Sequence, residues 1–158
     1  VVPLALGLLL AALAEELLFR GYPLRRLADA VGRRAAALVL AAAFGAAHLG
    51  NPNATALGAL NTGLAAVWLA TAFFSAGGMP LAWGLHFGWN AGLGLGFDAP
   101  VSGFTFDLPH LDYAPGRAAW LDGGAFGPEG GVAATLVFAA GTLVLARWPG
   151  PAPEEELA

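Results

Sequence analysis

Two adjacent carboxylates and an arginine, Glu15, Glu16 and Arg20, lie inside a segment that is otherwise apolar. An ionised side chain in the hydrocarbon of a bilayer costs about 2.5–3.5 kcal/mol even on lenient insertion scales, so such residues usually serve a function. Two of the three histidines, His48 and His86, also lie in apolar segments. Carboxylates and imidazoles are the side chains that most often move protons to and from water. The sequence therefore indicates water chemistry inside a membrane.

The spacing of the three charged residues divides their roles. On a helix, residues four apart share a face, whereas adjacent residues point about 100° apart. Glu16 and Arg20 are four apart, with the acid on the N-terminal side, which is the more favourable order. We therefore expect a structural ion pair between Glu16 and Arg20. Glu15 lacks this partner and is a candidate general base.

Two further polar residues share a face of a later apolar segment. His86 and Asn90 are four apart, so both side chains can donate hydrogen bonds toward one point, as an oxyanion site requires. Glu15 precedes the turn at Val31-Gly32 by about as many residues as separate that turn from His48, so a helical hairpin would place the two at one depth. We expect all four side chains to surround one cavity, with the arginine-rich turn protruding into water.

The composition is that of a membrane protein. The chain has 158 residues, of which 58% are hydrophobic and 11% charged, against about 25% charged in soluble domains. A soluble domain of this size buries only about 70% of the surface of its unfolded chain, too little for this much apolar surface. The chain has no cysteine, which excludes disulfides and thiolate chemistry, and it has no basic patch for nucleic acid.

A bilayer-spanning helix needs about 20 apolar residues, and the chain offers several such segments. We predict an all-α integral membrane bundle of about five helices, forming one membrane-embedded domain over residues 1–158. The predicted helices cover about residues 2–30, 33–49, 54–75, 81–97 and 132–148, and residues 98–131 form a loop at the water interface. The chain starts at Val1 rather than Met and shows no signal-peptide pattern, so we expect the C-terminal core of a longer protein.

The charges also predict an orientation. Four arginines cluster around the first turn, at positions 25, 26, 33 and 34, whereas the loop over residues 98–131 is acidic. The positive-inside rule places the arginine turn in the cytoplasm and the acidic loop outside. The chain is rich in Ala, Gly and Leu and contains no lysine, which is typical of GC-rich bacterial genomes, so we expect a bacterial cytoplasmic membrane.

Three ordered motifs resemble those of a known family. Glu15-Glu16-x-x-x-Arg20, then Phe44-x-x-x-His48, then His86-x-x-x-Asn90 are similar to the motifs of the CPBP intramembrane proteases. These proteases are related to the type II CAAX prenyl endopeptidase and to the Abi-like bacteriocin-processing and immunity proteins. The resemblance covers about residues 9–103. Any one motif is common, but three in order within apolar helices are specific.

The resemblance implies hydrolysis of a peptide bond within the membrane. In such enzymes the residues matched by Glu15 and His48 activate a water, and those matched by His86 and Asn90 stabilise the oxyanion. The implied partners are a peptide or a lipid-modified protein substrate and the membrane lipid.

The resemblance leaves the role of metal open. The family is often described as metalloproteases, but a metal-free glutamate mechanism without a cofactor is favoured here. Asn is a poor zinc ligand, and the chain has no His-Glu-x-x-His motif. A zinc ion held by Glu15, His48 and His86 remains the alternative.

Other interpretations of the same residues also remain open. A non-catalytic protein of the same fold, such as an immunity factor or scaffold, would bind a peptide without cleaving it. A transporter would use Glu15 and the histidines as a proton relay. Asn61, in the middle of a predicted span, is expected to help satisfy the polar site, and His110 is expected at the surface of the loop.

Overall fold

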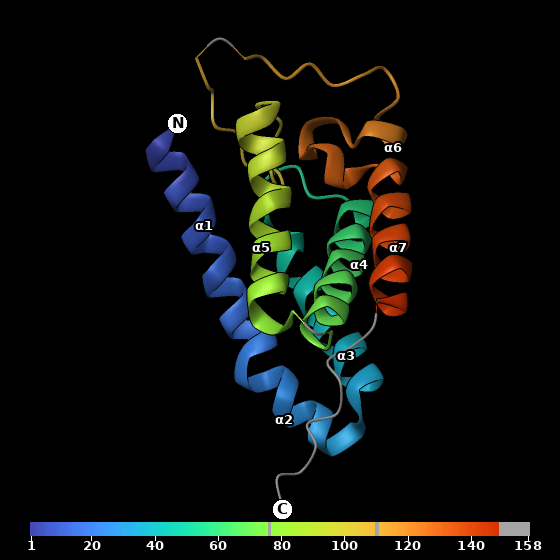
Figure 1. The fold of residues 1–158 in the computed structure, drawn as a ribbon. Coiled ribbons are helices and arrows are strands. Elements are labelled where there is room, and N and C mark those ends of the chain that lie inside the picture. The colour runs from blue at the N-terminus through green and yellow to red at the C-terminus, as the bar shows by residue number, and fades with distance from the viewer. Residues whose placement is uncertain (76, 110, 149–158) are drawn as a thin grey trace, which may run out of the picture.

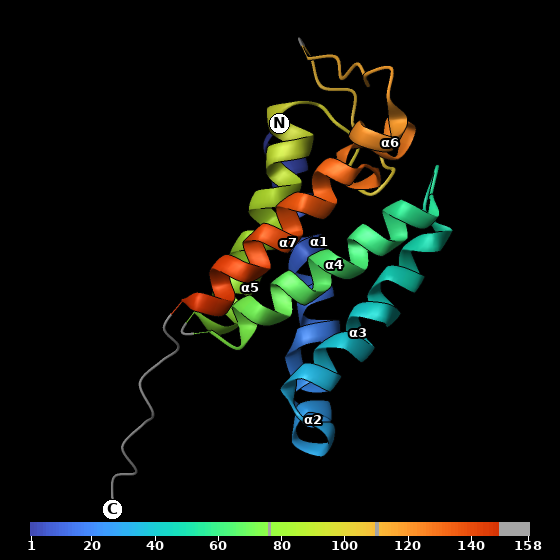
Figure 2. The ribbon, with the colours of Figure 1, turned by 90° about the vertical axis from the view of Figure 1, so that its right-hand side faces the viewer.

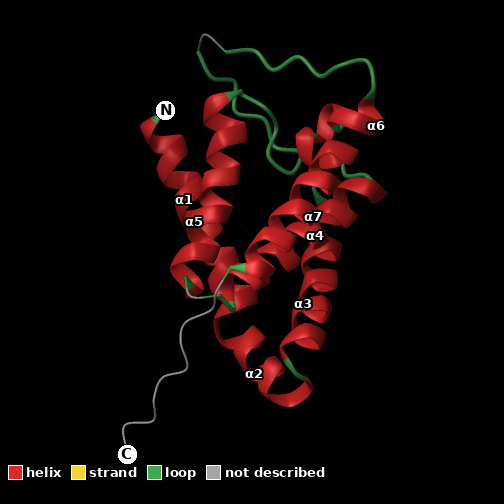
Figure 3. Cartoon of the chain, turned by 45° about the vertical axis from the view of Figure 1, so that its right-hand side comes forward, coloured by secondary structure: helices red, strands yellow, loops and turns green. Residues whose placement is uncertain are grey.

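The computed structural model describes residues 1–75, 77–109 and 111–148, and within these residues the protein is a bundle of helices (Figure 1). The long helices are α1 (Val2–Glu16), α2 (Tyr22–Val31), α3 (Arg33–Ala47), α4 (Ala56–Phe73), α5 (Gly78–Ala91) and α7 (Val132–Arg147). Shorter helical pieces are η1 (Leu17–Gly21), η2 (His48–Gly50), η3 (Gly92–Gly96), α6 (Ala119–Asp122), η4 (Gly124–Phe126) and η5 (Pro128–Gly130). Helices and loops account for all the described chain in Figure 3, which confirms the predicted all-α class. His110 lies outside the described residues.

Two helical stretches are long and apolar enough to cross a membrane, Val2–Val31 and Ala56–Phe73. Large apolar side chains on the outside of the bundle, including Leu10, Leu18 and Leu38, are more than half exposed, as expected where lipid is the solvent. The helix predicted over 81–97 begins at Gly78 and ends in a π-turn over Gly92–Gly96. These features agree with a helical membrane bundle.

The first helical stretch changes its geometry just after the two glutamates. Between α1 and α2 the backbone widens into the π-turn Leu17–Gly21, which contains Arg20. Pro23 has no N–H to donate to the carbonyl four residues earlier, and its ring crowds that carbonyl, so a regular α-helix is disfavoured here. A proline in the sequence thus explains the bend next to the charged motif.

Helix α4 occupies the middle of the bundle. It packs against α3, α5 and α7, while α1 packs against α5 and α2 against α3 (Figures 1 and 2). The turn between α2 and α3 is Gly32 alone, whose φ of +86° favours glycine. This hairpin projects beyond the ends of α4, α5 and α7 at one end of the molecule (Figure 1). The geometry matches the expected protrusion of the arginine turn.

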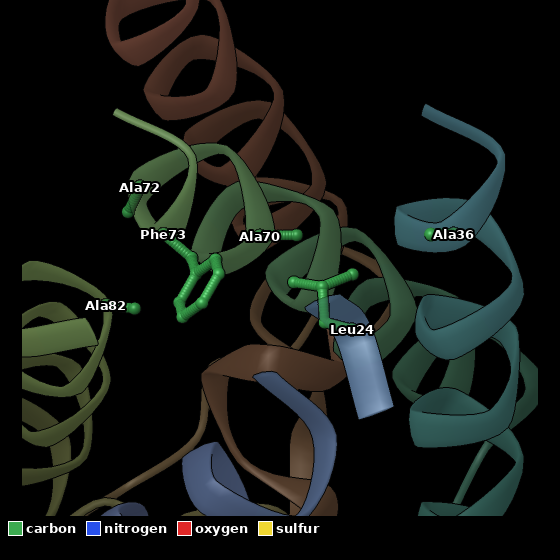
Figure 4. Packing of buried hydrophobic residues seen from close by; sticks show 6 residues of the cluster. All are labelled: Leu24, Ala36, Ala70, Ala72, Phe73 and Ala82. Atoms are coloured by element: carbon green, nitrogen blue, oxygen red, sulfur yellow. The ribbon is translucent and has the colours of Figure 1, made fainter. Parts of the chain in front are cut away.

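Small side chains allow the helices to pack closely. At the crossing of α3 and α4, a Cβ atom on Gly45 would lie 2.6 Å from the backbone oxygen of Ala59, so only glycine fits there. Leu24 of α2 joins four alanines and a phenylalanine from α3, α4 and α5 in a buried cluster (Figure 4). The cluster consists of Leu24, Ala36, Ala70, Ala72, Phe73 and Ala82. It fixes the hairpin against the end of α4 and the beginning of α5.

Candidate active site

A cavity of about 420 Å³ lies among α1, α3, α4, α5 and α7. All four side chains that were expected to converge line it, namely Glu15, His48, His86 and Asn90. The segment over residues 101–106 and Glu129 also contribute to its wall. The site is therefore built from helices that are far apart in sequence and from the loop that follows α5.

Glu16 and Arg20 form a buried pair beside this cavity. The Nη1 atom of Arg20 donates to Oε1 of Glu16 at 3.0 Å, and both side chains are at most 2% exposed. The guanidinium also lies over the Phe44 ring, 4.6 Å from its centroid. Spacing along the helix and an aromatic face from α3 together hold this pair in place.

His86 lies between the two glutamates. Its Nδ1 is 2.8 Å from Oε1 of Glu16, and its Nε2 is 3.7 Å from Oε2 of Glu15. A carboxylate can only accept, so the short contact assigns a proton to Nδ1. Nε2 then points toward Glu15. The sequence predicted the Glu16–Arg20 pair but not the contact between Glu16 and His86, because helical spacing contains no information about contacts between helices.

His48 occupies the end of α3, where the helix tightens into η2. Its Nδ1 lies 2.8 Å from the carbonyl oxygen of Phe44. A carbonyl can only accept a hydrogen bond, so Nδ1 carries the proton and Nε2 is left with a lone pair. The side chain is half-buried and lines the cavity. This is the tautomer that a general base needs.

Asn90 lies one turn after His86 on α5, is 9% exposed and lines the same cavity. The preceding residue, Trp89, donates from Nε1 to Oε1 of Glu129 at 3.0 Å. Ser102 donates to Oε2 of Glu129 through both its backbone N–H and its hydroxyl group. The wall on the Asn90 side of the cavity is therefore connected to the loop after α5.

Glu129 is a site residue that sequence reasoning missed. It is 6% exposed and lies in a Gly-rich loop with no helical periodicity. Its hydrogen bond with Trp89 joins two residues that are 40 positions apart in the chain. Asn61 was expected to help satisfy the site, and its Nδ2 donates to the backbone oxygens of Glu129 at 2.7 Å and Gly131 at 2.8 Å. Only the position of Glu129 as the single charged residue in a Gly-rich stretch, residues 123–131, could have signalled its role.

The described residues do not form a ready metal site. Within residues 1–75, 77–109 and 111–148, no group of three His, Asp or Glu side chains is arranged to hold a metal ion. Glu15, His48 and His86 line one cavity, and Nδ1 of each histidine binds a carbonyl or carboxylate oxygen, of Phe44 or Glu16, as the outer ring nitrogen of a metal-bound histidine also does. A zinc ion held by Glu15, His48 and His86 therefore stays a prediction.

The fold and the cavity first define the class of protein, which is a helical membrane protein with an internal polar site. A family model, Type II CAAX prenyl endopeptidase Rce1-like, matches residues 1–92, which is more than half of the chain. The chain belongs to this family, whose members are CAAX proteases of membranes. The match covers α1 to α5 and includes Glu15, His48, His86 and Asn90. No curated protein and no solved structure matches the chain.

Proposed function

We propose that the protein is an intramembrane endopeptidase in which Glu15 and His48 activate a water for hydrolysis of a peptide bond. The observation that carries the proposal is that Glu15, His48, His86 and Asn90, from three helices, line one cavity. Membership of the CAAX protease family supports the same activity.

The proposed reaction begins with removal of a proton from water. Glu15 accepts this proton while the Nε2 lone pair of His48 accepts a hydrogen bond from the other O–H group of the water, and the hydroxide attacks the carbonyl carbon of the substrate. The carbonyl π-electrons move to oxygen and form a tetrahedral oxyanion. Glu15 then returns the proton to the leaving nitrogen as the carbonyl re-forms and the C–N bond breaks, giving a carboxylic acid and an amine.

His86 and Asn90 are the proposed oxyanion donors. Glu16 accepts from Nδ1 of His86 and so directs its Nε2 toward Glu15 and the cavity. In the imidazolium form Nε2 also carries a proton and donates to the oxyanion. The Nδ2 group of Asn90 supplies a second donor one turn away.

The cavity lining favours an apolar or lipid-modified substrate. Leu4 and Leu8 of α1, Trp68 of α4 and Phe138 of α7 form much of its apolar surface. Such a lining binds a prenyl group or an apolar side chain and excludes bulk water from the reaction. The proposed location is the cytoplasmic membrane of a bacterium.

The proposed mechanism uses no metal, because asparagine is a poor zinc ligand and the chain has no His-Glu-x-x-His motif. The test is cleavage of a fluorogenic peptide, with and without a farnesyl group, by purified protein in nanodiscs. Wild type should cleave with EDTA or 1,10-phenanthroline present and contain no stoichiometric metal. Purified protein that contains one equivalent of zinc, and that loses its activity when a chelator removes this zinc, would contradict the metal-free mechanism.

The catalytic residue itself is tested by Glu15→Gln, with Asp29→Asn as the control. Asp29 is an exposed acid on the hairpin, paired with Arg26 and away from the cavity. Glu15→Gln should reduce kcat at least about 10³-fold, within the range for general bases, while the yield of folded protein stays unchanged. Wild-type cleavage by Glu15→Gln would refute the proposed function.

A further inference from the structure

Glu129 is a carboxylate whose two oxygens both accept hydrogen bonds at the cavity wall. Oε1 accepts from Trp89 at 3.0 Å, and Oε2 accepts from the backbone N–H of Ser102 and, at 3.0 Å, from its hydroxyl group. Hydrogen bonds to an ionised acceptor are about twice as strong as bonds between neutral groups. These bonds therefore fix the positions of Trp89 and Ser102 firmly.

The groups that Glu129 holds lie next to proposed catalytic residues. Trp89 precedes Asn90 on α5, and both line the cavity. On the other side, the Ser102 carbonyl accepts from Nδ2 of Asn51, which follows η2 and the His48 that begins it. Glu129 thus binds both the end of α5, through Trp89, and the turn at Ser102. This turn also binds the segment after α3, through Asn51.

The Ser102 turn needs external support. Ser102 has a φ of +48°, in the left-handed region that residues other than glycine rarely adopt. The next residue, Gly103, also has a positive φ and donates its N–H to the carbonyl of Phe126 at 2.9 Å. Strained backbone of this kind persists where surrounding contacts hold it, and such positions cluster at functional sites.

The backbone of Glu129 is itself anchored to two helices of the bundle. Asn61 of α4 donates to the carbonyls of Glu129 and Gly131, and Thr135 of α7 donates to Oδ1 of Asn61 at 2.6 Å. The carboxylate is therefore presented to the cavity from a rigid base. Asn61 thus binds two backbone carbonyls of this stretch, and the Glu129 carboxylate accepts three hydrogen bonds. A surface loop does not require so many contacts.

We propose that Glu129 is a positioning residue, which holds Trp89 and Ser102 so that Asn90 faces the oxyanion. The inference rests on the proposed function, but it concerns a part of the chain beyond the family match, which ends at residue 92. Glu129 does not act on the substrate itself. Its loss should misplace the oxyanion donor and so affect the transition state more than substrate binding.

The test compares Glu129→Gln with Asp122→Asn in the peptide-cleavage assay in nanodiscs. Asp122 is the matched control, because its carboxylate accepts from the backbone N–H of Gly124 in the same loop but does not line the cavity. Glu129→Gln should lower kcat by about 10- to 100-fold with KM within about twofold of wild type. Asp122→Asn should change neither constant by more than about twofold.

Two further variants keep the test decisive if Glu129→Gln folds poorly. Trp89→Phe and Ser102→Ala each remove side-chain donors to Glu129 and leave the Asn61 anchor intact, and each should lower kcat about 3- to 30-fold at unchanged KM. Glu129→Asp should restore part of the loss caused by Glu129→Ala. Wild-type kcat in both Trp89→Phe and Ser102→Ala, or a rise in KM alone, would overturn the proposal.

Failure of this inference is distinguishable from failure of the proposed function. If wild type cleaves and Glu15→Gln does not, the protease assignment stands, and the Glu129 variants alone decide the positioning role. If Glu15→Gln cleaves as wild type does, the proposed function fails, and the positioning role in that reaction fails with it.

Discussion

Glu15 and Glu16 are neighbours in the chain, yet the structure gives them different surroundings. Glu16 is fully buried and contacts both Arg20 and His86, whereas the side chain of Glu15 is 38% exposed and lines the cavity. The difference follows from the turn of about 100° between adjacent helical residues. One glutamate can therefore fix the position of His86 while the other reaches substrate and water.

Loss of the His48 side chain should slow the chemical step without weakening substrate binding. His48→Gln keeps a polar side chain of similar size but removes the basic Nε2. We expect kcat to fall by about 10²- to 10⁴-fold with little change in KM, as for other groups that assist proton transfer. Measurement of kcat and KM in the peptide-cleavage assay in nanodiscs checks this expectation. An unchanged kcat would exclude His48 from the activation of the water.

Glu16 should govern stability before it governs rate. Glu16→Ala leaves Arg20 buried without its counter-ion, and breaking a buried pair of this kind costs about 3–5 kcal/mol. We expect a sharp fall in the yield of folded protein and in thermal unfolding temperature.

The control for Glu16→Ala is Arg26→Gln, which breaks the exposed pair between Arg26 and Asp29. Exposed pairs contribute at most about 1 kcal/mol, so this variant should unfold within a few degrees of wild type. Equal unfolding temperatures for Glu16→Ala and wild type would contradict a stabilising role for the buried pair.

Among the contacts between individual residues, the sequence predicts some and not others. The Glu16–Arg20 pair lies within one helix, and helical spacing alone placed both residues on one face. The contact of Glu16 with His86 and the contacts of Glu129 with Trp89 and Ser102 join distant parts of the chain. Periodicity has no information about such contacts, and Glu129 lies in a loop without periodicity at all.

At the scale of elements, the crossing of α3 and α4 determines where His48 lies. Gly45 is buried at this crossing, one turn before His48, and a Cβ atom there would meet backbone atoms of Ala59 and Gly63. Backbone atoms cannot move aside independently of their helix. A methyl group at position 45 must therefore push the end of α3 away from α4.

Gly45→Ala should reduce both stability and cleavage, although alanine is the better helix former. Overpacking costs about 1–3 kcal/mol, which exceeds the gain of about 1 kcal/mol in helix propensity. Gly84→Ala on α5 is the control, because nothing lies within 4 Å of the added Cβ atom. Thermal unfolding in detergent should rank Gly84→Ala at or above wild type and Gly45→Ala below it, and the reverse ranking would refute the argument.

The helices themselves were largely predictable, whereas their packing was not. Apolar runs and turn residues such as Gly32 and Pro52 indicate where helices begin and end, since lipid requires every span to satisfy its own backbone. The helical pieces α6, η4 and η5 fall in the loop that composition alone describes as irregular. Of these, η5 packs against α4 and α7, α6 packs against α7, and η4 packs against α6 and η5, and a local pattern does not reveal such contacts.

For the whole molecule, charge and shape predict one orientation in the membrane. The α2–α3 hairpin and the loop that precedes α6 lie at opposite ends of the bundle (Figure 1). The hairpin has four arginines and one aspartate between residues 25 and 34, whereas residues 98–131 contain five acidic residues and one arginine. Cytoplasmic loops are enriched in arginine, so the hairpin should face the cytoplasm and the loop the opposite side.

Because the chain has no cysteine, single cysteines can test this orientation without background. Ala30 at the hairpin and Ala114 in the loop are both exposed, so Ala30→Cys and Ala114→Cys form a matched pair. A membrane-impermeant maleimide added to intact spheroplasts should label the cysteine at 114 at once and the one at 30 only after permeabilisation. Labelling of both from outside would mean that the bundle does not span the bilayer in this way. Labelling of position 30 alone would invert the orientation. The part of the cavity wall formed by residues 101–106 would then lie toward the cytoplasmic side, which a substrate made in the cytoplasm reaches without crossing the membrane.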